Sequence, residues 1–182
     1  MMRDIVSIRP AQPEDAQDLA RVRIDAWRSA YRGLVPDEYL ASMNYQAETE
    51  RWEQQLGDPV RRRNIFAAEM RDHAVGFAVC GPVRPDSIAG VVCKGELYAI
   101  YLLPVYQGMG IGRQLVRQCA QDLVDRGLQD MVLWVLKDNH PACGFYQRLG
   151  GILAGEKSIE IGEKTLLEVA YIWSDLNVLL EK

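Results

Sequence analysis

Residues that bind metals, cross-link chains or span membranes are scarce in this sequence of 182 residues. Its four cysteines form no C-x-x-C pair and are accompanied by two histidines, which argues against a zinc site. No apolar run approaches the roughly 18 residues of a membrane span, and Met1 to Asp4 lead into no apolar signal segment. We therefore expect a reduced, cytoplasmic protein with no bound metal and no membrane contact.

Clustered positive charge is also scarce. The formal net charge is −4, and the longest basic block is Arg61-Arg62-Arg63, so we expect no nucleic-acid partner. The acidic balance mildly favours a cationic partner such as an amine or polyamine. A chain of this length and ordinary composition most simply forms one domain, spanning residues 1–182.

The most informative stretch runs from residue 96 to residue 126. Seven apolar residues, 97–103, are typical of a strand buried on both faces, and Pro104 should end that strand. Three glycines then follow within five residues: Gly108, Gly110 and Gly112. Apolar residues at helical spacing predict a helix to about Arg126, which Gly127 ends.

This predicted helix begins without a capping side chain. No Ser, Thr, Asp or Asn lies between Gly108 and Arg113, so the N–H groups of the first turn need an outside acceptor. Glycines keep β carbons out of the way, and the helix dipole adds partial positive charge. A phosphate or pyrophosphate would meet these conditions, with Arg113 adding charge. A glycine-rich turn hydrated by water is the alternative.

The spacing distinguishes between phosphate-binding motifs. A nucleotide P-loop needs Gly-Lys-Ser/Thr, whereas Arg113-Gln114 follows Gly112, and the dinucleotide fingerprint needs glycine where Arg113 stands. Residues 107–112, QGMGIG, do match Q/R-x-x-G-x-G/A. In this the sequence resembles the GNAT superfamily of acyl-CoA N-acyltransferases, in which the turn holds the pyrophosphate of coenzyme A.

A second motif follows at the separation that this family shows. After the apolar run 131–136, residues 137–151 read KDNHPACGFYQRLGG. This resembles the family's strand, asparagine, short helix with an aromatic-Tyr pair, and Leu-Gly. Gly151-Ile152 replaces the common Gly-Phe. The two motifs cover about the C-terminal half of the chain.

The order of predicted elements agrees with this resemblance. Strands are predicted at 5–9, 64–69, 74–79, 97–103, 131–136, 156–161 and 165–173, with a loop at 81–95. Helices are predicted at 13–31, 36–40, 46–56 and, after the glycine turn, to about 126, with a short one around Tyr146. The pattern alone supports an α/β or α+β class. The resemblance implies a GNAT fold, a mixed twisted β-sheet flanked by helices on both faces, with the cofactor entering where the central strand and the next parallel strand splay apart.

The resemblance implies that acetyl-CoA is the acyl donor, although a longer acyl donor stays open. The implied cofactor-binding residues are Tyr101, Leu102, Leu103, Gln107, Gly108, Met109, Gly110, Ile111, Gly112, Arg113, Asn139 and Tyr146. A strand bulge near Leu102 would present a backbone N–H to the thioester carbonyl. Asn139 is equally natural as a turn or cap residue before Pro141.

Two residues are candidates for proton transfer. By resemblance, the Tyr146 phenol would give a proton to the departing coenzyme A thiolate, and aromatic packing beside Phe145 is its alternative. Glu96 stands eleven residues before Gln107, where some family members keep a catalytic glutamate that accepts the amine's proton. Its alternatives are a solvent-facing or salt-bridged side chain, with water relaying the proton.

The acceptor pocket is the least defined part. Five aromatic residues are expected to form its walls: Trp27, Tyr31, Tyr39, Tyr98 and Trp134. Core packing is the alternative for Trp27. The resemblance implies an N-acetyltransferase that acts on a primary amine of a small molecule or peptide by direct attack in a ternary complex. The alternatives are a non-catalytic acetyl-CoA sensor and a nucleotide-binding protein of another class. A homodimer is common in the family but has no signature in this sequence.

Overall fold

The computed structural model describes residues 6–85 and 92–181. Its strands are β1 Ser7–Pro10, β2 Ile65–Met70, β3 His73–Pro82, β4 Gly95–Leu102, β5 Met131–Leu136, β6 Ile152–Ile161 and β7 Lys164–Trp173. Its α-helices are α1 Ala16–Ala30, α2 Asp37–Ser42, α3 Tyr45–Gly57, α4 Pro59–Arg62, α5 Ile111–Asp125, α6 His140–Arg148 and α7 Asn177–Leu180. The first residue of the strand predicted at 5–9 and part of the loop predicted at 81–95 lie outside the described residues.

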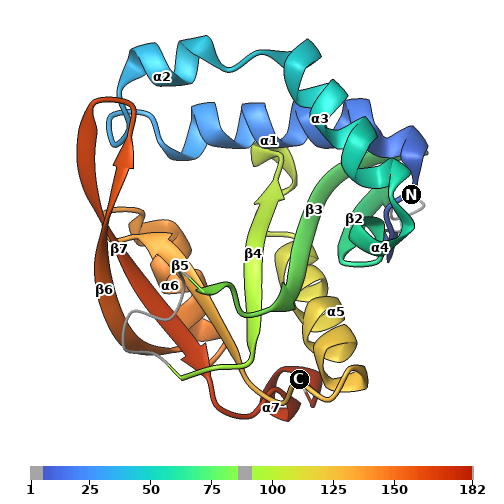
Figure 1. The fold of residues 1–182 in the computed structure, drawn as a ribbon, viewed down its shortest axis with the longest axis vertical. Helices are drawn as coiled ribbons and strands as arrows, with labels where there is room; N and C mark the ends of the chain where they lie inside the picture. Colours follow the sequence, from blue (N-terminus) through green and yellow to red (C-terminus); the bar gives the residue numbers. More distant parts are fainter. Residues whose placement is uncertain (1–5, 86–91, 182) are drawn as a thin grey trace.

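The strands form one mixed sheet in the order β1-β2-β3-β4-β5-β7-β6 (Figure 1). β4 and β5 pair in parallel, and the other neighbouring pairs run antiparallel. This agrees with the predicted mixed sheet. The order places the two motif-bearing segments, β4-α5 and β5-α6, side by side at the centre.

β4 and β5 stay together over a short distance only. β4 pairs with β3 from Gly95 to Leu102, but its pairing with β5 consists of Gly95↔Met131 and Glu96↔Val132. Beyond these pairs the two strands diverge (Figure 1). The second half of β4 is therefore half-buried, and the prediction that residues 97–103 are buried on both faces is wrong for residues 98–102.

The irregularity in β4 lies at a different place from the one expected. Val79 pairs with Ala99 and Cys80 with Leu97, so Tyr98 is the extra residue of a bulge. The register is regular from Ala99 to Leu102. The bulge predicted near Leu102 is therefore wrong.

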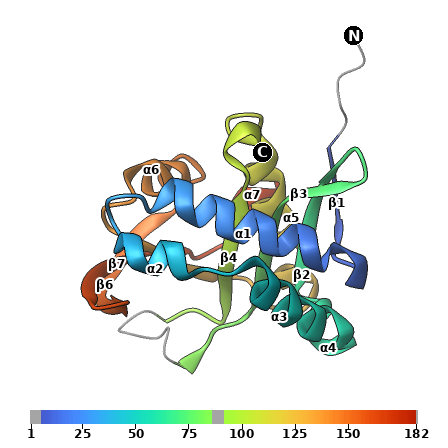
Figure 2. The ribbon, with the colours of Figure 1, turned by 90° about the horizontal axis from the view of Figure 1, so that it is seen from above.

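Helices cover both faces of the sheet, as predicted. On β3, Phe77 points toward α3 and packs edge-on against Trp52, with ring centroids 4.9 Å apart. Cys80, three residues on, lies on the other face, where its Sγ is 3.9 Å from the carbonyl oxygen of Cys119 in α5. Figure 2 shows the two groups of helices, α1 to α3 and α5 with α6.

Most boundaries shift by one to three residues, and three differences are larger. β6 begins at Ile152 rather than at residue 156, and α4 and α7 were not predicted. A local signal for α4 was present, because the Asp58 side chain accepts from the Val60 N–H at 2.8 Å and Pro59 occupies the first helical position. Among the described residues, no helix is both long and apolar enough to cross a membrane.

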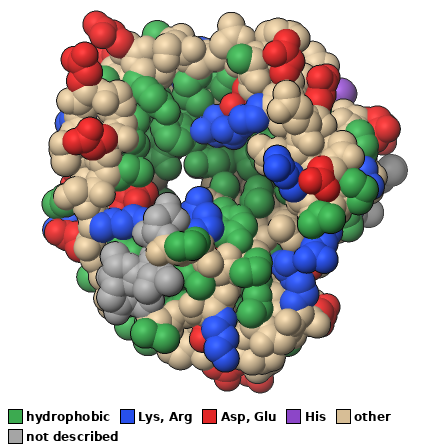
Figure 3. All heavy atoms as spheres, in the orientation of Figure 1, with side chains coloured by type: hydrophobic (Ala, Val, Ile, Leu, Met, Phe, Trp, Pro, Cys, Tyr) green, Lys and Arg blue, Asp and Glu red, His purple; other side chains and the backbone are tan. Residues whose placement is uncertain are grey.

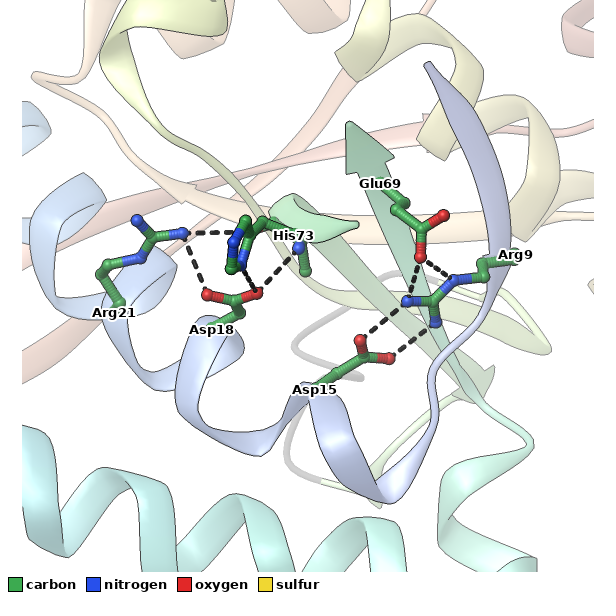
Figure 4. Close-up of polar contacts among 7 residues, drawn as sticks. Arg9, Asp15, Asp18, Arg21, Glu69 and His73 are labelled. Atoms are coloured by element: carbon green, nitrogen blue, oxygen red, sulfur yellow. Dashed lines mark hydrogen bonds and ion pairs between the residues drawn. The ribbon is translucent and has the colours of Figure 1, made fainter. Parts of the chain in front are cut away.

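The start of α1 is tied to the sheet by an ion-pair network (Figure 4). Arg9 of β1 donates to Asp15 at 2.7 and 2.8 Å and to Glu69 of β2 at 2.6 Å. Burial raises the pKa of Asp15, but the hydrogen bonds from Arg9 and from the Gln12 N–H outweigh burial and leave that pKa below its usual value. The network fixes where α1 begins on the sheet.

Candidate active site

The turn before α5 adopts the conformation that its glycines allow. Gly108 and Gly110 have φ angles of 75° and 81°, in the left-handed region that other residues avoid. Gly110 is the N-cap of α5 and provides no side-chain cap. The N–H of Gln114 donates to Gly110 O at 3.2 Å, so the N–H groups before it point out of the helix end. The prediction of an uncapped helix start is confirmed.

The third glycine has a different role. Gly112 lies within α5, and a β carbon on it would stand 3.3 Å from the ring of Phe145 in α6. Its absence of a side chain lets α6 approach the first turn of α5. Because Tyr146 follows Phe145, this contact sets the position of Tyr146 relative to the glycine turn.

The other predicted cofactor residues of this segment differ in what they expose. Met109 is exposed, whereas Ile111 is buried in the core and offers only its backbone. Gln107 donates from its side chain to Leu102 O at 3.4 Å. Leu103 donates its N–H to Val75 and accepts from Tyr106, so its backbone is already engaged.

Positive charge gathers beside the start of α5. Arg113 lines a small cavity of about 20 Å³ together with Arg117, one helical turn later, and with Arg148 of α6. The sequence analysis identified Arg113 but missed the other two. The four-residue spacing from Arg113 could have indicated Arg117, since residues four apart share a helix face. The position of Arg148 beside them depends on how α6 packs against α5, which no local pattern shows.

An opening passes through the molecule at the place where β4 and β5 diverge (Figure 3). Hydrophobic side chains and Lys or Arg side chains surround it in this view. Trp27 and Tyr31 of α1 form an aromatic wall with Tyr101 of β4, with centroids 4.7 Å and 6.4 Å from the ring of Trp27. The phenols of Tyr31 and Tyr101 interact, and Tyr101 lies on the part of β4 that does not pair with β5. We call this opening the cleft.

Tyr146 is close to the same place from the other side of the sheet. Its side chain is buried, and its ring lies 6.0 Å from that of Tyr171 and 6.5 Å from that of Trp173. Burial raises the pKa of Tyr146, and Tyr101 contributes in the same direction. The phenol therefore keeps its proton at neutral pH and can act as a donor.

Asn139 acts as the cap of α6. Its side-chain oxygen accepts from the N–H of Ala142 at 3.3 Å, and the residue is buried. The cap alternative for Asn139 is confirmed. A contact with the cofactor stays a prediction.

Glu96 is fully buried and bound to Arg84. The Arg84 backbone N–H donates to one carboxylate oxygen at 2.9 Å, and its Nε and Nη2 donate to the other at 3.1 and 2.5 Å. The guanidinium also lies 4.8 Å from the ring of Tyr98, whose hydroxyl donates to Pro82 O. The salt-bridge alternative for Glu96 is thus what the structure shows, and a catalytic role stays a prediction.

Trp134 carries a cation on its face. Nζ of Lys157 lies 4.2 Å from the centre of the Trp134 ring and 3.9 Å from an oxygen of Glu168 on β7. Burial raises the pKa of Glu168, against the opposing effects of Lys157 and Arg84. The sequence analysis missed Glu168. Its signal was one carboxylate within the apolar strand Lys164–Trp173.

A separate cavity of about 620 Å³ lies between α1, α3 and the β2–β3 turn. Its charged groups are paired with each other, since Asp18 accepts from His73 and the Ala74 N–H and forms an ion pair with Arg21 (Figure 4). Its lining also includes Leu103 and Tyr106, which precede the glycine turn. In residues 6–85 and 92–181, no cluster of three or more His, Cys, Asp or Glu side chains is placed to hold a metal ion.

Residues 24–151 match the Acetyltransferase (GNAT) family, and the chain belongs to this family of acyltransferases. It is 36% identical over 176 residues to the uncharacterized N-acetyltransferase YuaI of Bacillus subtilis (strain 168), covering 96% of each chain. It is 25% identical over 145 residues to a spermidine N(1)-acetyltransferase of Thermoplasma acidophilum, covering 80% of this chain and 87% of that one. The fold is similar to that of the PaiA N-acetyltransferase from Thermoplasma acidophilum, solved in complex with coenzyme A, with a TM-score of 0.70, 22% identity, and coverage of 90% of this chain and 98% of that chain.

Proposed function

We propose that this protein transfers the acetyl group of acetyl-CoA to a primary amine of a small molecule or peptide, by direct attack in a ternary complex. The observation that carries the proposal is the meeting of three features at one place. The uncapped start of α5 packs on α6 through Gly112 and Phe145, α6 carries the buried Tyr146, and Tyr146 lies near Tyr101 on the part of β4 that has left β5. The relative named a spermidine N(1)-acetyltransferase and the structure solved with coenzyme A support the acceptor class and the donor.

The residues of the turn fit a diphosphate. The N–H groups at the start of α5 supply donors, Gly108 and Gly110 leave open space around them, and Arg113 adds positive charge. Arg117 and Arg148 extend that charge and suit the cofactor's further phosphate. Along the separated edge of β4, backbone groups of Tyr101 and Leu102 would bind the pantetheine arm, and Asn139 and Tyr146 would border it.

Acetyl-CoA supplies an acetyl group activated as a thioester. The chain supplies orientation and proton transfer. The Tyr146 hydroxyl, kept protonated by its burial, gives its proton to the departing thiolate. Glu96 is the sequence-based choice for the group that accepts the amine's proton. Trp27, Tyr31, Tyr39, Tyr98 and Trp134 remain the proposed acceptor walls.

The test is release of coenzyme A thiol from acetyl-CoA in the presence of polyamines, amino acids, aminoglycosides and peptide N-termini, with the amide identified by mass. We expect turnover with at least one amine and none without an amine. Binding of acetyl-CoA without turnover across the panel would favour the sensor alternative instead. Thermal stabilisation by ATP or NAD, with none by coenzyme A, would contradict both.

A further inference from the structure

We propose that Glu168 binds the ammonium group of the acceptor amine and accepts its proton, while Glu96 positions Arg84. This inference rests on the proposed acetyl transfer and names a residue and a substrate class for it. The acceptor is a cationic aliphatic primary amine.

The sheet register directs Glu168 toward the cleft. Glu168 pairs with Leu136 of β5 and with Lys157 of β6, and directly opposed residues place their side chains on one face. Leu136 packs with Val35 and Leu40 and with the partly buried Trp27 and Tyr31. The Glu168 carboxylate is therefore on the face that α1 and α2 cover.

Charged and phenolic groups lie near this carboxylate. The phenols of Tyr31 and Tyr101 on the aromatic wall both interact with its charge. Lys157, Arg84 and Glu96 also act on that charge. Glu168 is therefore close to both the aromatic wall and the Glu96–Arg84 pair. Its side chain is 16% exposed, so solvent or a ligand can reach it.

The two carboxylates beside the cleft differ in how they are bound. Glu96 is 1% exposed and accepts three hydrogen bonds from Arg84, so protonating it would break a charge-assisted network. Among the described residues, the ion-pair partner of Glu168 is Lys157, at the long distance of 3.9 Å. Burial raises the pKa of Glu168, which makes it a stronger base than an exposed glutamate. Glu168 is the better placed of the two to exchange a proton.

The groups around Glu168 also indicate the kind of ligand that it would bind. A partly buried carboxylate stabilises a cation that enters beside it, and the aromatic side chains of Tyr31 and Tyr101 lie near the same carboxylate. An ammonium on an aliphatic chain has the matching charge and shape.

The proton balance is complete without another reactant. Glu168 takes one proton from the ammonium, and the freed nitrogen lone pair forms the C–N bond at the acetyl carbon as the C–S bond breaks. Tyr146 gives its proton to the sulfur, and the second nitrogen proton restores the Tyr146 hydroxyl. Glu168 then releases its proton to solvent, so one amide, one thiol and one proton leave.

The first test compares pH profiles of kcat/KM for the full chain and Glu168→Gln, with the best amine of the panel. The wild-type profile should have an acidic limb above the ordinary glutamate pKa of about 4.3. Glu168→Gln should remove that limb and lower kcat/KM on the order of 100-fold. Lys157→Met should move the limb to higher pH, because Lys157 lowers the pKa of Glu168. A purely structural role would not move the limb. Glu160→Gln is the matched control, since Glu160 is exposed on the opposite face of the same hairpin.

The second test does not depend on turnover. In protein with ¹³C-labelled glutamate carboxyls, 1,4-diaminobutane should shift the Glu168 resonance, identified by its absence in Glu168→Gln. If the wild type acetylates an amine while Glu168→Gln keeps its rate and acidic limb, or if Glu96→Gln removes the limb instead, the inference is wrong. If the wild type acetylates nothing, the proposed function fails, and the carboxyl shift still reports whether Glu168 binds amines.

Discussion

Phe145 occupies the space that a side chain on Gly112 would need, with 3.3 Å between its ring and the position of a β carbon there. This contact joins α5, whose start forms the proposed phosphate site, to α6, which carries Tyr146. The spacing between the proposed diphosphate site and Tyr146, the proposed proton donor, is therefore set by direct helix packing.

Two glycines with the same backbone geometry should respond differently to substitution. Gly110→Ala and Gly127→Ala both place a β carbon at a φ near 80° in open space, so each should cost about 1–2 kcal/mol of unfolding free energy. Gly110→Ala should also weaken coenzyme A binding by about tenfold, because the strain disturbs the donors at the start of α5. Calorimetric titration measures the affinity, and equal affinities of the two variants would remove the turn from the binding site.

Tyr146→Phe should lower kcat on the order of 100-fold while leaving the dissociation constant of coenzyme A nearly unchanged. The reason is that the hydroxyl acts on the leaving thiolate and the ring continues to pack. Tyr171→Phe is the matched control, since Tyr171 is a buried neighbour whose hydroxyl accepts from Gln147. Stopped-flow thiol detection measures the rate, and equal rates for the two variants would contradict the role of Tyr146.

Four buried or half-buried tyrosines should make the fold sensitive to alkali. Burial raises the pKa of Tyr31, Tyr98, Tyr101 and Tyr146 above the ordinary value of about 10. Between the unfolded pKa and the raised folded pKa of each group, the unfolded chain loses the proton while the folded chain keeps it, so the unfolding free energy should fall by up to about 1.4 kcal/mol per pH unit for each group. Below pH 10 this contribution is fully present. Urea titrations from pH 8 to 11 measure how the unfolding free energy changes with pH. In Tyr146→Phe this slope should correspond to one proton fewer than in the wild type.

The ion-pair network around Arg9 should stop stabilising the fold at acid pH. The pKa of Asp15 is lowered, so its stabilising contribution is present above the unfolded value of about 3.9 and is lost as the pH falls through the folded value. Asp15→Asn should cost about 2 kcal/mol at pH 7 and flatten the acid dependence. Asp125→Asn, at an exposed helix position, should do neither. Urea titrations at pH 7 and pH 3 measure both effects.

Local signals in the sequence predicted the glycine turn, the uncapped start of α5 and the strand Met131–Leu136 with its observed bounds. These features depend on residues next to each other. The divergence of β4 from β5 could not be predicted from the residues alone, because strand pairing and twist decide it. For the same reason the half-exposed part of β4 and the bulge at Tyr98 were misplaced.

The grouping of charged residues beside the cleft could not be predicted from local sequence either. Glu96 was recognised by its spacing from Gln107, but its partner Arg84 lies in a segment predicted as loop. Glu168 was visible as a lone carboxylate in an apolar strand, yet nothing local showed that Tyr31 of α1 lies near it. Packing between distant segments creates this group.

Because β4 and β5 pair through only two residue pairs, the rest of β4 forms an edge inside the sheet. Exposed sheet margins usually invite pairing with another chain, yet this one is enclosed by strands on both sides and by α1 above. The proposed pantetheine arm, with its amide groups, could pair with backbone groups on this enclosed edge. The protein would thus present strand-like hydrogen-bonding groups to the proposed cofactor without exposing them to aggregation.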